Sequence, residues 1–193
     1  MKTGFIAILN MGSERVVADL AVSTLEQNPD EFRSLLDLCF LEQYPLSMRA
    51  ARALQLYCEK HPESIYPYIE EVVLKILKSR IDGVKRNFLK IFAEYIDIEQ
   101  ISDPGPLLNA CFDWLQDPRQ KPALRIHAMN LIHKLGKKEP ELLHELHVTL
   151  EMIDESSEIS IRNYARKMLR KLSRQSAACP EERSDEGSAV GNK

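Results

Sequence analysis

The stretch PALRIHAMNLIHKLGK, residues 122–137, repeats apolar residues with the period of one helix face. The apolar positions are Leu124, Ala128, Leu131, Ile132 and Leu135. Their offsets of 0, +4, +7, +8 and +11 follow the 3.6-residue turn of an α-helix, whereas a strand would alternate every second residue. Pro122 stands where the first turn of a helix accepts proline. The stretch therefore predicts a helix that buries one apolar stripe.

The same template recurs along the chain. Its four copies, separated by 38, 40 and 37 residues, start at Leu46, Val84, Leu124 and Ile161. A second template, with apolar offsets of 0, +3, +4, +7 and +8, alternates with it and starts at Phe32, Ile69 and Leu107. The segment 13–28 also matches this second template. Two alternating helix types at a fixed period predict an α-solenoid, in which each helix pair buries its stripe against its neighbours.

Proline and glycine residues fall between the periodic segments and indicate the helix boundaries. The nine predicted helices cover approximately residues 13–28, 30–43, 46–60, 64–79, 83–96, 105–116, 122–137, 139–154 and 158–174. No segment alternates with the period of a strand, so the expected fold class is all-α. We expect an N-terminal extension over residues 1–12, one solenoid domain over 13–175, and an acidic tail over 176–193. The tail is expected to be disordered because it has almost no large apolar residue to bury.

The helix pairs resemble the HEAT repeats of the armadillo-like superfamily. A hallmark of those repeats is a basic residue directly after the first apolar residue of the second helix, here called the B helix. Val84-Lys85, Leu124-Arg125 and Ile161-Arg162 match it, whereas Leu46-Ser47 departs from it. In these repeats an aspartate of the preceding turn often accompanies the basic residue, and the candidates are Asp82 and Asp117. The resemblance implies a right-handed superhelix of four A/B pairs after a leading helix, with the B helices lining a concave face.

Composition and motifs exclude several classes of protein. The chain has 193 residues, of which 44% are hydrophobic and 28% charged, and this balance suits a folded domain. Its four cysteines stand singly, without the paired spacing of a zinc or redox site. The chain contains neither a phosphate-binding glycine loop nor a nucleophile or metalloprotease motif. We therefore expect no cofactor, no metal and no membrane segment, and a cytoplasmic location.

Charge divides between the two helix types although the whole chain is nearly neutral. Over the predicted segments the A helices carry a net charge of −9 and the B helices +12. Helical geometry places a set of mostly basic residues opposite the apolar stripe of the B helices. These candidate partner-binding residues are Arg52, Arg86, Lys90, His133, Lys137, Arg166, Lys167, Arg170 and Arg174. The division predicts a basic groove that strengthens toward the C-terminus.

A basic groove focuses electrostatic potential on an acidic ligand. Our first hypothesis is a non-enzymatic scaffold or adaptor that binds an acidic protein or peptide. The alternative is a nucleic-acid-binding protein, similar to the HEAT-like alkylpurine DNA glycosylases, although the outward B positions offer no aromatic side chain for base stacking. A solvated charged surface with ion pairs between helices would require no partner at all.

Other chemically capable residues are better explained by packing. The single tryptophan, Trp114, lies on the apolar stripe of an A helix, where core packing is expected. Cys39 and Cys111 also occupy core positions of their helices. His144 and His147 share a helix face, but a zinc site needs a third protein ligand. We expect both histidines at the surface or half-buried.

Overall fold

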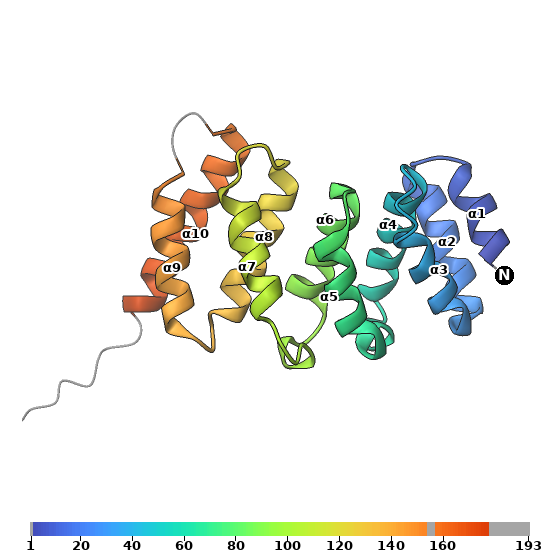
Figure 1. Cartoon of the computed structure of the whole chain (residues 1–193), viewed down its shortest axis with the longest axis horizontal. Helices are drawn as coiled ribbons and strands as arrows, with labels where there is room; N and C mark the ends of the chain where they lie inside the picture. The colour runs from blue at the N-terminus through green and yellow to red at the C-terminus, as the bar shows by residue number, and fades with distance from the viewer. Residues whose placement is uncertain (1, 154–156, 178–193) are drawn as a thin grey trace, which may run out of the picture.

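The computed structural model describes residues 2–153 and 157–177, which form a row of paired helices (Figure 1). Within these residues there are ten α-helices and no strand. The helices are α1 (Lys2–Asn10), α2 (Arg15–Gln27), α3 (Phe32–Cys39), α4 (Leu46–Cys58), α5 (Ile69–Lys78), α6 (Asp82–Lys90), α7 (Gly105–Gln116), α8 (Pro122–Leu135), α9 (Pro140–Glu151) and α10 (Ile159–Ala177). The predicted all-α solenoid is confirmed.

The helices stack in two layers. The even-numbered helices pack successively on one another, α2 on α4, α4 on α6, α6 on α8 and α8 on α10, and we call them the B layer. Each odd-numbered helix packs on the even-numbered helix that follows it, with α5 on α6 making the sparsest of these contacts. Figure 1 shows the pairs following one another along the long axis of the molecule. Every internal pair is therefore enclosed by two neighbours, and the end pairs have one.

The start of the solenoid differs from the sequence-based prediction. Ten helices are present in the described part of the chain instead of nine, because α1 forms within residues 1–12, which we had expected to be an extension. Phe5 and Leu9 of α1 are buried in the common core. The helix expected at 13–28 is α2, and it packs in the B layer as the second member of a first pair. From Phe5 onward, Ile8 and Leu9 match the second template, but Gly12 and Ser13 stand at its last two positions, so the sequence did not reveal α1.

The B-helix template describes the core closely. Its twenty positions on α4, on α6 and the turn that follows, on α8 and on α10 are all buried except Tyr95 and Leu169, which are half-buried. Phe88 is fully buried in α6 and its ring stacks on that of Phe40 at a centroid distance of 5.1 Å. Cys39 and Cys111 are buried as predicted, and burial raises the pKa of both thiols. Their chemistry is that of small apolar residues.

Helix α6 continues into a π-helical turn, Ile91–Tyr95, which leaves carbonyl groups without partners within the helix. Lys134 of α8 supplies a hydrogen-bond donor at this end of the helix. Its ammonium group donates to the carbonyl oxygens of Phe92 and Ile96. A cation at the C-terminal end of a helix also interacts favourably with the helix dipole. This contact joins α6 to α8. Lys134 is therefore a basic residue of the B layer with a structural role.

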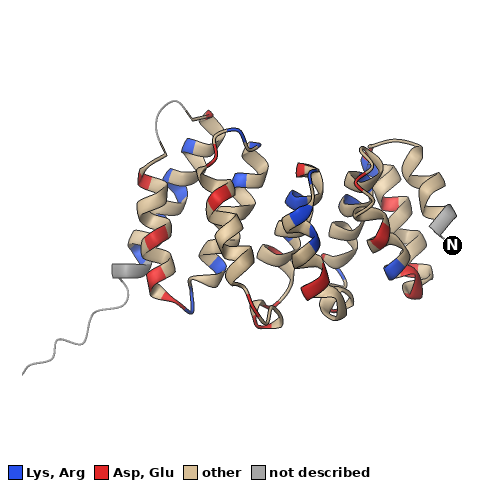
Figure 2. Ribbon diagram, viewed as in Figure 1, with Lys and Arg blue, Asp and Glu red and all other residues tan. Residues whose placement is uncertain are grey.

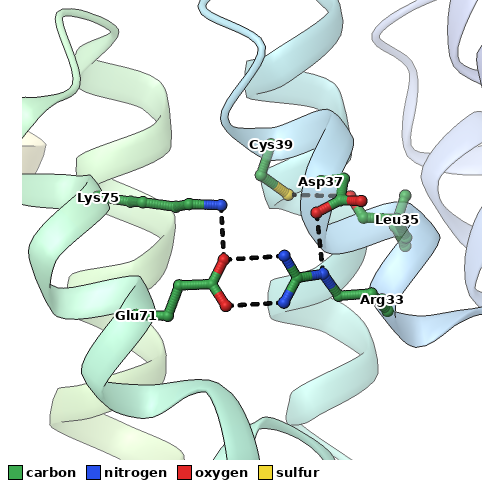
Figure 3. Close-up of polar contacts among 6 residues, drawn as sticks. All are labelled: Arg33, Leu35, Asp37, Cys39, Glu71 and Lys75. Carbon is green, nitrogen blue, oxygen red and sulfur yellow. Dashed lines mark hydrogen bonds and ion pairs between the residues drawn. The ribbon is translucent and has the colours of Figure 1, made fainter.

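Polar contacts connect neighbouring repeats at separations close to one repeat length. In Figure 3 the Arg33 guanidinium of α3 donates two hydrogen bonds, of 2.7 and 3.0 Å, to the Glu71 carboxylate of α5, 38 residues away. The Lys75 ammonium lies 2.6 Å from the same carboxylate. These two cations, Lys75 first, lower the pKa of Glu71. We call the odd-numbered helices the A layer. Charged residues of the A layer thus pair with one another between neighbouring repeats.

Two of the basic residues that follow the first apolar residue of a B helix, Lys85 and Arg125, make contacts that support the fold. Lys85 lies with its ammonium 3.7 Å from Asp82, as predicted, and 5.4 Å from the centre of the Trp114 ring. The buried Arg125 donates from Nε to the carbonyl oxygen of Leu115 at 2.9 Å, and burial lowers its pKa. The second predicted aspartate, Asp117, has Arg119 as its ion-pair partner, with 2.9 Å between Oδ1 and Nε.

Candidate partner-binding surface

The nine predicted site residues do not form one uniform groove. Arg52, Arg86 and Lys90 are half-buried on α4 and α6, whereas Lys137, directly after α8, is exposed. The four residues predicted on α10 are all exposed. His133 of α8 is only 4% exposed, and the surface position predicted for it is wrong.

The burial of His133 follows from the packing around α8. This helix contacts α6, α7, α9 and α10, so more of its circumference is covered than a single apolar stripe requires. Helical arithmetic places a residue opposite the stripe, but it cannot show that a second neighbour covers that side. His133 has an interaction partner within the protein, and its side chain is buried away from the surface.

The centre of the B layer pairs its own charges. The Lys90 ammonium lies 3.8 Å from the Glu94 carboxylate and 5.7 Å from the centre of the Tyr95 ring. The Tyr95 hydroxyl accepts a 3.0 Å hydrogen bond from the Gln55 side chain and lies 3.4 Å from the Glu59 carboxylate. Interaction with the Tyr95 hydroxyl is the largest cause that raises the pKa of Lys90. A ligand at this place would have to displace contacts that the protein already makes.

His127 lies in the same region, on α8. Burial lowers its pKa to about 4, with further lowering from the charges of Lys90 and Arg86. Its Nδ1 atom is 3.8 Å from the Glu94 carboxylate, too far for a hydrogen bond, and the burial effect outweighs that attraction. The imidazole is therefore neutral at physiological pH. It marks a part of the B layer where positive charge is already in excess.

Helix α10 differs from the centre of the layer. Five of its cations are exposed: Arg166, Lys167, Arg170, Lys171 and Arg174. The helix contains no acidic residue, and within the described part of the chain these five cations make no ion pair. Acidic residues instead lie along its neighbour α9, red in Figure 2. Lys171 was not among the predicted residues, although its spacing of four from Lys167 places it on the same side of the helix.

A second basic site lies at the N-terminal ends of α4, α6 and α8, around a cavity of about 340 Å³. Arg86 lines it, together with Arg80 and Lys121. The sequence analysis missed the last two residues because it considered only positions within the B helices. Both precede a B helix by one or two residues, and a scan of the turns between A and B helices would have found them.

Chemistry that requires a metal ion finds no support in the described residues, which contain no group of three or more potential ligands among His, Cys, Asp and Glu. His144 is exposed, and His147 is half-buried with Nδ1 3.7 Å from the Glu151 carboxylate. Trp114 is half-buried against the core and faces Lys85. Among the helices described, none is long and apolar enough to cross a membrane.

Comparison with known proteins agrees with this architecture. A family model described as HEAT repeat domain matches residues 8–172, which includes most of the ten helices. Comparison with curated proteins and with solved structures found no significant match. Domains of this kind are repeat scaffolds capable of protein interaction. The repeat template, the two-layered stack and the family match over residues 8–172 together show that this chain belongs to the HEAT repeat family.

Proposed function

We propose that this protein is a non-enzymatic scaffold that binds an acidic protein or peptide through basic residues of its B layer, with α10 as the main contact. The observation that carries the proposal is the set of five exposed cations on α10 that have no acidic partner among the described residues. A cluster of unpaired like charges is unfavourable in the isolated protein. An acidic ligand would relieve that repulsion.

The cations of α10 form two rows on the helix. Arg166, Arg170 and Arg174 follow one another at intervals of four residues, and Lys167 and Lys171 form the second row. Residues four apart lie one turn from each other, so the longer row extends over about 12 Å. This length matches three or four carboxylates of an extended or helical segment. Guanidinium groups can also bind each carboxylate through two parallel hydrogen bonds.

The apolar side of α10 is not available for a ligand. Ile161, Ala165, Met168 and Leu172 are buried in the core. Tyr164 is half-buried, and its hydroxyl donates to Asn130 of α8 at 2.7 Å. The face that remains is polar and basic, without an exposed aromatic ring on which a base could stack. This composition favours an acidic peptide over single-stranded nucleic acid.

The test is a fluorescence anisotropy titration with a labelled 15-residue peptide rich in glutamate. We expect the triple variant R166E/K167E/R170E to lose binding while its helical circular dichroism signal stays unchanged, because the substituted side chains are exposed. The control variant R15E/K60E/K78E makes the same change in net charge elsewhere. Arg15 lies on α2, Lys60 lies two residues after the end of α4, and Lys78 ends α5. Retention of peptide binding by the α10 variant would contradict the proposal.

Nucleic-acid binding is the alternative that the same basic surface supports. It predicts affinity for a 20-base-pair DNA or a 20-nucleotide RNA that falls by about three to five orders of magnitude between 50 and 200 mM salt when six to ten phosphates are contacted. Titrations of both nucleic acids in parallel with the peptide decide between the two. Tighter binding of either nucleic acid than of the peptide at 150 mM salt would favour this alternative.

A further inference from the structure

The cavity at the N-terminal ends of α4, α6 and α8 has the features of an anion site. Its volume of about 340 Å³ is in the range of small-ligand pockets. Arg80, Arg86 and Lys121 line it, and none of the three makes an ion pair within the described residues. The single acidic residue in the lining, Asp82, has its carboxylate 3.7 Å from the Lys85 ammonium. The cavity wall therefore carries uncompensated positive charge.

Backbone groups add to this charge. Helices α6 and α8 both begin at the cavity, and no side chain caps either N-terminus. The first N–H groups of a helix have no partner within the helix, and the helix dipole favours an anion near them. Pro122 at the start of α8 has no N–H, so α6 offers more of these donors. The pKa of His127, one turn beyond the cavity residue Ala123, is lowered chiefly by burial and further by the charges of Lys90 and Arg86.

The wall of the cavity is held in place by an unusual residue. Glu42 has φ of 55°, a left-handed conformation that is unfavourable for a residue with a side chain. Its carboxylate accepts hydrogen bonds from the hydroxyl of Ser79 at 2.5 Å and from the backbone N–H of Arg80 at 2.9 Å. Tyr44, two residues on, lines the cavity and is 74% exposed. Glu42 thus connects the segment that bears Tyr44 to the one that bears Arg80.

We propose that this cavity binds the phosphate group of a phosphorylated side chain within the acidic partner. A phosphate monoester carries a charge of −1.5 to −2 and presents three acceptor oxygens. Two guanidinium groups and one ammonium group can meet those oxygens from different sides, which a carboxylate with two oxygens cannot match. The exposed Tyr44 ring offers an apolar contact for the residue next to the phosphate. The inference rests on the proposed function, because it assumes a peptide ligand.

The choice of a monoester follows from charge and space. A phosphodiester within a nucleic-acid strand carries one negative charge. The strand must also continue beyond the cavity on both sides of that phosphate. The cavity instead suits the end of one side chain. Helix α8 lines it and also packs on α10, so both basic sites belong to neighbouring parts of the B layer. One peptide with a phosphate and several carboxylates could use both.

The test compares two labelled 12-residue peptides that contain glutamates and differ only in phosphoserine or serine at the central position. Isothermal titration calorimetry with the full chain measures both affinities. We expect the phosphopeptide to bind about tenfold tighter or more, as charge-assisted hydrogen bonds predict. Arg86→Gln and, separately, Lys121→Gln should remove most of that preference. Lys121 is exposed, so its variant keeps the fold even if the half-buried Arg86 variant is destabilised.

Control variants and competitors separate this inference from the proposed function. Arg170→Gln on α10 should weaken both peptides by the same factor and leave their ratio unchanged. Inorganic phosphate at 10 mM should compete with the phosphopeptide and not with the serine peptide. Equal affinity for the two peptides, or a preference that survives Lys121→Gln, would overturn the phosphate site alone. If neither peptide binds, both the phosphate site and the acidic-peptide scaffold are wrong.

Discussion

The centre of the B layer and its last helix use the same residue types for opposite purposes. At the C-terminal ends of α6 and α8 the cations are enclosed: Lys90 faces Glu94 and Tyr95, and Lys134 binds backbone carbonyls. On α10 five cations face solvent without acidic partners in the described chain. In the first region the cations bind other groups of the protein, and in the second they are available to a ligand.

This difference shows that net charge by helix type is a poor guide to a binding surface. The B helices were predicted as one basic series, yet the residues on the inner repeats have neighbours on both sides that can neutralise them. Among the described residues, α10 packs mainly on α8 and α9. A charge becomes available when no residue of an adjacent repeat lies within reach of it. Position in the stack therefore decides whether a charge is exposed and unpaired more than residue type does.

The largest effect should come from removing a central core side chain. Phe88→Ala deletes a fully buried ring that stacks on Phe40, and we expect a loss of about 3–5 kcal/mol in the free energy of unfolding. Met168→Ala on α10 deletes a buried side chain of the end pair, where the structure can relax, and should cost about 2 kcal/mol. Urea denaturation followed by circular dichroism measures both. Equal losses would contradict the view that the inner repeats are packed more rigidly than the end.

The second effect is a pH dependence that arises from His127 at the centre of the B layer. The pKa of His127 is about 4 in the folded protein against 6.5 as its ordinary value. The unfolded chain therefore takes up a proton first, and the contribution of this residue to stability is present above pH 6.5 and is lost as the pH falls toward 4. Between pH 7.5 and pH 5 the loss attributable to His127 should be about 2 kcal/mol.

His127→Gln measures that contribution, since glutamine keeps a polar side chain without titrating. The variant should lose less stability than the wild type when urea denaturation is repeated at pH 7.5 and pH 5. The control is His144→Gln on α9, an exposed position, which should leave the pH dependence of the wild type unchanged. If both variants behave alike, the buried histidine does not sense acid.

The smallest effects should differ in sign between the two regions. Lys90→Gln removes an ion pair with Glu94 and a contact with the Tyr95 ring, and should lower the free energy of unfolding by about 0.5–1 kcal/mol. Arg170→Gln removes two like-charge pairs, with Arg166 and Arg174, and should raise it by about 0.2–0.5 kcal/mol. Thermal denaturation in low salt resolves both. Destabilisation by Arg170→Gln would mean that α10 has a structural partner for this charge.

Much of the fold could be predicted because the same apolar template recurs in several helices. The four copies of the B template place their apolar residues in the core, and the A template does the same for Leu35, Val72 and Cys111. The separation of about 38 residues also reappears in the contacts between repeats, such as Arg33 with Glu71. Only α1 escaped, because Phe5, Ile8 and Leu9 match the second template in part, while Gly12 and Ser13 stand at its last two positions.

The candidate site was harder to predict because it depends on what covers each residue. His133 and Arg170 hold the same position on their B helices, +9 from the first template residue and opposite the stripe. The structure buries the first residue, because α9 and α10 also pack on its helix, and it exposes the second. Arg80 and Lys121 lie in turns, far apart in sequence, and only the stacking of α4, α6 and α8 brings them to one cavity.

By itself the amino-acid sequence determined that this chain is an all-helical stack of HEAT repeats, because apolar periodicity is a local property that every repeat carries. It also determined that the B helices are basic. The tertiary structure decided which of those charges are neutralised within the protein, which are buried and which face solvent. That outcome depends on electrostatic and packing contacts between residues about 40 positions apart, and these contacts exist only once the helices are stacked.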